Sequence, residues 1–147
     1  MDPRFLTWLA GRCRASVYTP DLVLASFRSP AGPALRLVRR QDLWEHPRVR
    51  LALQHRREVE VYSDAEGRGL LALAWNVLGV RTVSVEVEPS WRGRGLGRRL
   101  ALAARGLAPA AEPLFASISP GNAASLRAFL VAGYGPVGSE ALLFAEA

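Results

Sequence analysis

A predicted strand, a glycine-rich turn and a predicted helix follow one another without interruption between Val80 and Leu107. Valines alternate with polar residues over Val80–Val87, a pattern that predicts a strand with one apolar face. Pro89 ends this strand, because proline cannot donate a hydrogen bond to a neighbouring strand. Leucine and alanine then dominate Gly95–Leu107, which predicts a helix. A chain that contains this unit is expected to fold as a mixed α/β domain.

Glycines occupy alternate positions in this turn, and arginines flank them. A glycine has no Cβ, so a ligand can approach its backbone closely. The first turn of a helix presents unpaired N–H groups and the positive end of the helix dipole, which together suit a phosphate. Arginine adds charge and can bind two phosphate oxygens at once. The residues predicted to bind phosphate are Arg92, Gly93, Arg94, Gly95, Leu96, Gly97 and Arg98.

Two common phosphate-binding motifs do not fit this turn. The dinucleotide fingerprint G-x-G-x-x-G requires a third glycine where this chain has Arg98 or Leu100. A Walker P-loop requires a Gly-Lys pair, and the chain contains no lysine. The alternative is a turn that only joins the strand to the helix. A connection of that kind does not need three alternating glycines, so we favour an anion site.

The rest of the chain contains weaker patterns. The charged stretch Gln41–Arg57 is predicted to be helical, with Asp42 capping a first piece and Pro47 starting a second. The other predicted elements are helices at Pro3–Ala15 and Asn122–Ala132, turns at Ser29–Pro33 and Asp64–Gly67, and strands at Leu22–Phe27, Ala34–Val38, Val59–Ser63, Leu70–Trp75, Pro113–Ile118, Tyr134–Val137 and Ala141–Phe144.

Composition excludes several classes of protein. With 147 residues, half of them hydrophobic, the chain is expected to form one globular domain over 1–147. No apolar run reaches the roughly 20 residues of a membrane helix, and the start lacks a signal-peptide pattern, so we expect a cytoplasmic protein with no membrane partner. Cys13 is the only cysteine, so no intramolecular disulfide is expected. His46 and His55 have no ligand cluster around them, so no metal site is expected.

The charged residues favour a phosphate-bearing partner. All 19 basic residues are arginines, and the net charge is +6. The lack of lysine, together with abundant alanine and glycine, indicates a GC-rich bacterial genome. The arginines are scattered from Arg4 to Arg127, so we do not expect a nucleic-acid partner. A nucleic-acid binder stays open as an alternative, and it predicts a steep salt dependence of binding.

The turn resembles the cofactor motif of the GCN5-related N-acetyltransferase (GNAT) superfamily. That motif is Gln or Arg, two residues, Gly, one residue, and Gly or Ala, and Arg92, Gly95 and Gly97 match it. Val87 and Pro89 match the Val-x-Pro lead-in of many bacterial members. A second motif, an Asn-led helix closed by a Gly-aromatic pair, is similar to this chain at Asn122, Ser125, Phe129 and Ala132-Gly133-Tyr134.

The resemblance covers Glu58–Phe144 and implies a GNAT-like acyl-CoA N-acyltransferase fold. This fold is a central mixed sheet with helices on both faces, splayed where the Val80–Val87 strand meets the Pro113–Ile118 strand. Residues 58–144 are then the cofactor-binding half. Residues 1–57 match no member and form the acceptor-side half, where the family builds acceptor specificity.

The resemblance also implies an activity, the transfer of an acetyl group from acetyl-CoA, as co-substrate, to a primary amine. Backbone N–H groups around Val85 and Val87 are expected to orient the acetyl carbonyl and the pantetheine. Asn122 and Phe129 complete the residues expected to bind the cofactor. The acceptor stays open among small molecules, peptide N-termini and protein lysines, and a homodimer is one option because a final strand can pair across a dimer.

Acetyl transfer needs a base for the acceptor ammonium and a proton for the leaving thiolate. Glu86, on the strand face opposite the valines, is the candidate base, and the alternative is that it pairs with a nearby arginine. Glu88 and Ser84 are further candidates, although Glu88 is expected to balance Arg92 or Arg94.

The usual proton donor of the family is missing. Many members carry a tyrosine seven residues after the Asn that leads the helix, and here that residue is Phe129. Ser125 or a water supplies the proton instead, or the thiolate leaves unassisted. Tyr134 is expected to be a core residue. This departure keeps a second interpretation open, a CoA-binding regulatory module without efficient turnover.

Overall fold

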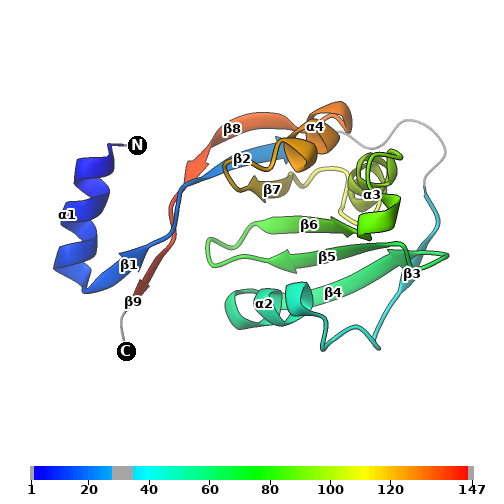
Figure 1. Ribbon diagram of the computed structural model, residues 1–147, viewed down its shortest axis with the longest axis horizontal. Helices are drawn as coiled ribbons and strands as arrows, with labels where there is room; N and C mark the ends of the chain where they lie inside the picture. The colour runs from blue at the N-terminus through cyan, green and yellow to red at the C-terminus, as the bar shows by residue number, and fades with distance from the viewer. Residues whose placement is uncertain (1, 28–34, 146–147) are drawn as a thin grey trace.

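The computed structural model describes residues 2–27 and 35–145 of the chain, and these form one mixed α/β fold (Figure 1). The predicted turn at Ser29–Pro33 lies outside the described residues. Most other predicted elements are present close to their predicted bounds. In chain order the elements are α1 Pro3–Cys13, β1 Ala15–Val17, β2 Asp21–Ser26, β3 Leu37–Arg39, α2 Pro47–His55, β4 Arg57–Asp64, β5 Gly69–Trp75, β6 Arg81–Val87, the 3-10 turn η1 Pro89–Trp91, α3 Leu96–Arg105, β7 Leu114–Ile118, α4 Ala123–Val131, β8 Gly135–Glu140 and β9 Leu143–Ala145.

The main sheet has the strand order β3-β4-β5-β6-β7-β2-β8. β5 and β6 are antiparallel and pair along their whole length. β6 and β7 are parallel, and within the described residues they pair only at Thr82 and Phe115, near the start of each strand. Beyond this point the strands diverge, so the predicted splay is confirmed. The edge of β6 that faces β7 therefore carries backbone groups without a strand partner.

Each face of the main sheet packs against helices, as predicted. α3 and α4 cover one face, where Leu100 and Phe129 pack with Leu71 and Val83. α2 covers the other face, where Val49 and Ala52 pack with residues such as Leu70. Leu70 and Leu71 are neighbours on β5 and belong to opposite cores, because successive side chains of a strand point to opposite faces.

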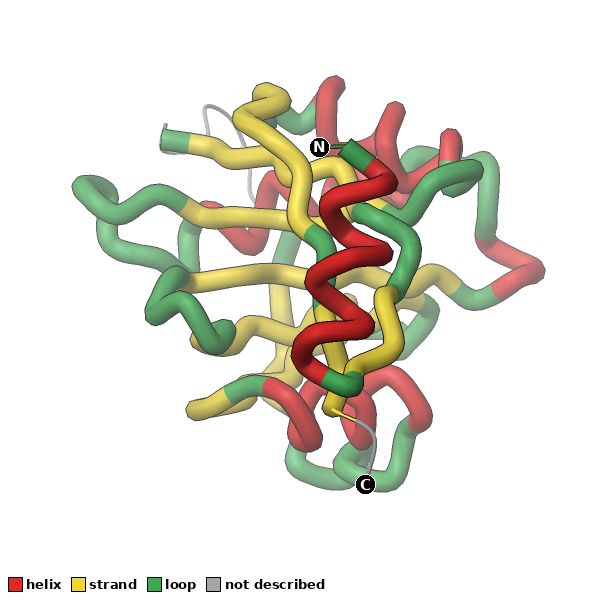
Figure 2. The backbone as a smooth tube through the Cα atoms, turned by 90° about the vertical axis from the view of Figure 1, so that its left-hand side faces the viewer, coloured by secondary structure: helices red, strands yellow, loops and turns green. Residues whose placement is uncertain are grey.

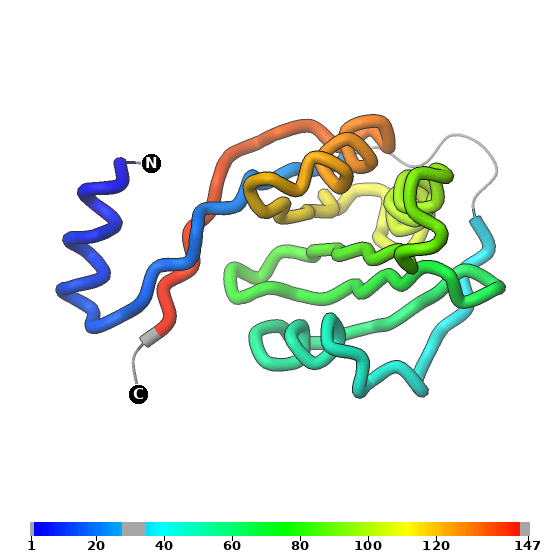
Figure 3. The backbone as a smooth tube through the Cα atoms, in the orientation of Figure 1, coloured from blue at the N-terminus to red at the C-terminus, as the bar shows by residue number. Residues whose placement is uncertain are grey.

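The N-terminal segment supplies a strand to the far part of the sheet. β2 lies between β7 and β8 and is antiparallel to both. The β2–β8 pair continues outward as a ribbon of β1 and β9, so the two ends of the chain run side by side (Figure 3). α1 contacts β1 and stands outside the main sheet (Figure 2). Residues from both predicted halves, 1–57 and 58–144, therefore share one sheet.

The helix predicted over Gln41–Arg57 is wrong in its first part. Only Pro47–His55 is helical, and Pro47 starts it as predicted. Asp42 caps no helix, because its carboxylate accepts hydrogen bonds from Arg40 Nε at 2.8 Å and Arg40 Nη2 at 2.6 Å. These bonds lower the pKa of Asp42 to about 2. His46 caps α2 instead, since its Nδ1 accepts a hydrogen bond from the Arg48 N–H at 3.3 Å.

No helix within residues 2–27 and 35–145 has the length and hydropathy that crossing a bilayer requires.

Candidate functional site

The glycine turn has the backbone geometry that only glycine adopts without strain. Gly93 and Gly95 have φ angles of 75° and 78°, in the left-handed region. A Cβ placed on either residue would meet no atom of the described chain within 4 Å, so the backbone here faces open space. Gly95 is the N-cap of α3, and no side chain caps this helix. The first N–H groups of α3 are therefore available to a ligand, as the anion-site prediction requires.

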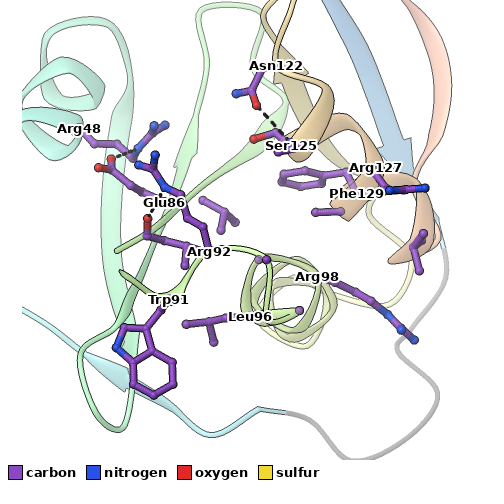
Figure 4. Close-up of a pocket in the computed structure, with 18 residues that line it drawn as sticks. Arg48, Glu86, Trp91, Arg92, Leu96, Arg98, Asn122, Ser125, Arg127 and Phe129 are labelled. Atoms are coloured by element: carbon purple, nitrogen blue, oxygen red, sulfur yellow. Dashed lines mark hydrogen bonds and ion pairs between the residues drawn. The ribbon is translucent and has the colours of Figure 1, made fainter. Parts of the chain in front are cut away.

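A cavity of about 680 Å³ opens over this turn, beside the end of β6 (Figure 4). β6, the turn, α3, α4 and the start of α2 contribute to its wall. Every residue that the sequence predicted for the site lines this cavity, except Arg94 and the two further candidates for the base, Ser84 and Glu88. These residues are Val85, Glu86, Val87, Arg92, Gly93, Gly95, Leu96, Gly97, Arg98, Asn122, Ser125 and Phe129. The structure thus brings the two sequence motifs together around one space.

Arg94 packs on an aromatic ring and does not line the cavity. Its Cζ lies 4.5 Å from the centroid of the Trp91 ring. Arg68, from the β4–β5 turn, lies 3.9 Å from the same centroid. Both contacts are cation–π interactions, and they anchor the turn to the sheet. The side chain of Arg94 is therefore not part of the cavity wall, and its contact with a phosphate stays a prediction.

Glu86 forms an ion pair with Arg48 of α2 at one end of the cavity (Figure 4). Arg48 Nε and Glu86 Oε2 are 2.6 Å apart, and both side chains are a little over a third exposed. Burial raises the pKa of Glu86. The hydrogen bond and charge of Arg48, with smaller contributions from His46 and Arg92, outweigh burial and lower the pKa below its ordinary value. Glu86 is therefore ionised at neutral pH. The ion-pair alternative is confirmed, and the role as base stays a prediction.

Glu88 does not balance the arginines of the turn. It is exposed, and within the described part of the chain it forms no ion pair with Arg92 or Arg94. Arg92 Nε instead donates a hydrogen bond to the carbonyl oxygen of Val87 at 3.1 Å. That prediction was wrong, because Arg92 turns back onto the end of β6.

The second motif forms the wall opposite the turn. Asn122 caps α4, since its Oδ1 accepts a hydrogen bond from the Ser125 N–H at 3.1 Å. The Ser125 hydroxyl lines the cavity and makes no hydrogen bond with the described residues. Phe129 is only 3% exposed and packs edge-on against Tyr134, with ring centroids 4.9 Å apart. Tyr134 is a core residue, as predicted, and its hydroxyl donates to the Ala101 carbonyl at 3.1 Å.

Two charged residues of the wall were not predicted from the sequence, Arg48 and Arg127. Nothing local marks either one, because each is one arginine among 19. The two histidines, for which no metal site was expected, both make structural contacts. His46 caps α2, and the His55 ring lies 5.0 Å from the Phe144 ring, measured between centroids. In the part of the chain that is described, no group of three or more His, Cys, Asp or Glu side chains could hold a metal ion.

Solved structures of other proteins have the same fold. No protein-family model matches this sequence, and no curated protein matches it. A GNAT-family acetyltransferase from Novosphingobium aromaticivorans is 20% identical, with a TM-score of 0.60 over 90% of this chain and 68% of that one. A GCN5-related N-acetyltransferase from Kribbella flavida is 16% identical, with a TM-score of 0.56 over 96% of this chain and 63% of that one.

A Drosophila protein has a TM-score of 0.62 at 16% identity, over 97% of this chain and 58% of that one. The chain therefore spans only about three-fifths to two-thirds of these structures. The GNAT-like acyl-CoA N-acyltransferase fold, predicted from two short motifs, is confirmed.

Proposed function

We propose that this chain, which has the GNAT fold, transfers the acetyl group of acetyl-CoA to a primary amine. The observation that carries the proposal is the cavity over the glycine turn, beside the end of β6. One part of its wall is an uncapped helix start with an open glycine turn, and another part is a carboxylate on β6. The first feature suits a pyrophosphate, and the second suits an ammonium group.

The cavity wall supports a thioester cofactor between these two features. Val85, Val87 and Leu96 give it an apolar stretch that suits a pantetheine arm. Beyond Thr82, β6 has backbone groups with no strand partner toward β7. N–H groups on that edge are suited to hold the acetyl carbonyl and to stabilise the oxyanion that forms during attack.

The reaction needs three events at this place. One ammonium proton leaves to give the neutral amine, and the amine nitrogen then attacks the carbonyl carbon. The carbon–sulfur bond breaks while the nitrogen loses its second proton, which balances the proton that the thiolate gains. Glu86 is the only carboxylate in the described wall, and it is assigned to accept the ammonium proton directly or through a water. Ser125 is assigned to donate a proton to the thiolate, because this residue lines the cavity and its hydroxyl makes no hydrogen bond with the described residues.

Acetyl-CoA binding and turnover are measured together to test this function. Calorimetric titration gives the affinity for acetyl-CoA, and release of the CoA thiol is followed with a panel of small amines, peptide N-termini and lysine peptides. Release above the amine-free rate supports the acetyltransferase. If acetyl-CoA does not bind, the proposed function is wrong.

The second candidate is a CoA-binding module that regulates and does not turn over. Two observations favour it: Phe129 offers no hydroxyl to a thiolate, and Glu86 is already paired with Arg48. This candidate predicts tight CoA binding with no amine-dependent thiol release from any acceptor class in the panel.

Phe129→Tyr is expected to raise the single-turnover rate if thiolate departure limits it. The ring lines the cavity while most of it is buried, so a hydroxyl at its edge reaches either the cavity or the core. In the cavity it can donate a hydrogen bond to the developing thiolate. In the core it lacks a partner and costs roughly 1–3 kcal/mol of stability.

Single-turnover rate and thermal stability, measured side by side, separate these outcomes. Tyr134→Phe is the matched control, because it removes a hydroxyl bonded to Ala101 inside the core. It should lower stability by about 1 kcal/mol and leave the rate unchanged. A clear loss of stability in Phe129→Tyr with no gain in rate would contradict the placement of Phe129 beside the thiolate.

A further inference from the structure

Two arginines from different helices lie at the side of the cavity away from Glu86. Arg98 belongs to α3 and Arg127 to α4, and both line the wall. Figure 4 shows both side chains extending to the same side, opposite the Arg48–Glu86 pair. Arg92 lies across the start of α3 from Arg98 in this view. The arginines of the site therefore form two groups and not one.

The contact between α3 and α4 positions Arg98 and Arg127 beside each other. A Cβ on Gly97 would lie 3.8 Å from the Ala128 Cβ, so the helices touch closely at these residues. Arg98 follows Gly97 and Arg127 precedes Ala128, so the two side chains start beside the point of contact. Residues 124, 128 and 131 of α4 also line the cavity, which is the spacing of a single helix face.

Within the described residues, Arg98 and Arg127 have no acidic partner. Neither Arg98 nor Arg127 forms an ion pair with any described residue. Neither α3 nor α4 contains an acidic residue. The wall as a whole carries four arginines and one glutamate, and Arg48 already pairs with that glutamate. Two like charges on touching helices repel each other, and an anion bound between them would reverse this.

We propose that Arg98 and Arg127 bind the phosphomonoester on the 3′ position of the CoA ribose, so that the site selects CoA over dephospho-CoA. The inference rests on the proposed function, because it assigns a second anion subsite of the same ligand. The pyrophosphate belongs to the glycine turn, on the other side of the α3 start. A phosphomonoester carries about −1.5 to −2 charges at pH 7 and offers three acceptor oxygens to two guanidinium groups.

Calorimetric titration with CoA and with dephospho-CoA tests the subsite. The wild-type chain should bind CoA about tenfold or more tightly than dephospho-CoA. Arg98→Gln and Arg127→Gln should each remove most of this preference by weakening CoA alone. An unchanged affinity of Arg127→Gln for dephospho-CoA shows that the fold and the pyrophosphate site are intact.

Arg99→Gln is the matched control. Arg99 neighbours Arg98 on α3, is exposed, and does not line the cavity. It should keep the full preference for CoA. Equal wild-type affinities for the two ligands would overturn the subsite while leaving the CoA site standing. An equal loss in Arg99→Gln would also overturn it, because general charge would then be the cause. If neither ligand binds, the proposed function fails as well.

Discussion

Replacing Gly95 with valine is expected to lower the affinity for acetyl-CoA by roughly a hundredfold or more. Gly95 has φ 78°, a conformation that a β-branched residue adopts only with strain. The new side chain would also fill the open space in front of the α3 start, where phosphate oxygens must approach. Both effects remove hydrogen bonds from N–H groups to a charged ligand. Calorimetric titration measures the loss.

Gly79→Val separates loss of the site from loss of the fold. Gly79 has φ 71° in the β5–β6 turn, and a Cβ there also meets no atom within 4 Å. It does not line the cavity. The control should therefore lose similar stability and keep its affinity for acetyl-CoA. A folded Gly95→Val protein with wild-type affinity would contradict the assignment of this turn to the cofactor.

The site could be predicted from the sequence where its parts are local. The turn from Arg92 to Arg98 and the cap at Asn122 each lie within a few residues, and their geometry follows from glycine conformation and helix capping. The alternation of valines that predicted β6 is also a local signal, because it lies within one strand. Local rules of this kind also gave the order of strands and helices after residue 58.

Long-range contacts left no such local signal. Arg48 and Glu86 are 38 residues apart, and no periodicity connects them. The insertion of β2 between β7 and β8 depends on pairings with strands about 90 and 115 residues later. Asp42 was mispredicted for a local reason: it had the residue type of a helix cap, but Arg40, two residues earlier, holds its side chain, and a capping rule does not consider this competing contact. The Arg94 side chain packs on Trp91, three residues earlier, which the motif spacing did not predict, and its contact with phosphate stays a prediction.

Glu86→Gln is expected to lower the maximal rate by about 10²–10⁴ if Glu86 is the base, and to leave acetyl-CoA affinity nearly intact. Glutamine keeps the shape of the side chain and cannot accept the ammonium proton. The fold should survive, because the Arg48–Glu86 pair is partly exposed and such pairs contribute only about 0–1 kcal/mol. Glu88→Gln is the matched control, since Glu88 is exposed, lies outside the wall and should keep its rate.

The ion pair with Arg48 gives this prediction a pH dependence with a defined sign. Because the pKa of Glu86 is lowered, the carboxylate stays ionised throughout the neutral range, and loss of rate from its protonation begins only at acidic pH. Arg48→Gln removes the hydrogen bond and charge that lower this pKa, so burial then dominates and the pKa rises. The acid limb of the rate profile should therefore move toward neutral pH in Arg48→Gln. It should be absent in Glu86→Gln, which has no carboxylate to protonate.

A Glu86→Gln enzyme with full activity at neutral pH would remove Glu86 from the mechanism. If Arg48→Gln and Glu86→Gln lose rate equally and the acid limb of the Arg48→Gln rate profile does not move, the Arg48–Glu86 ion pair only shapes the cavity.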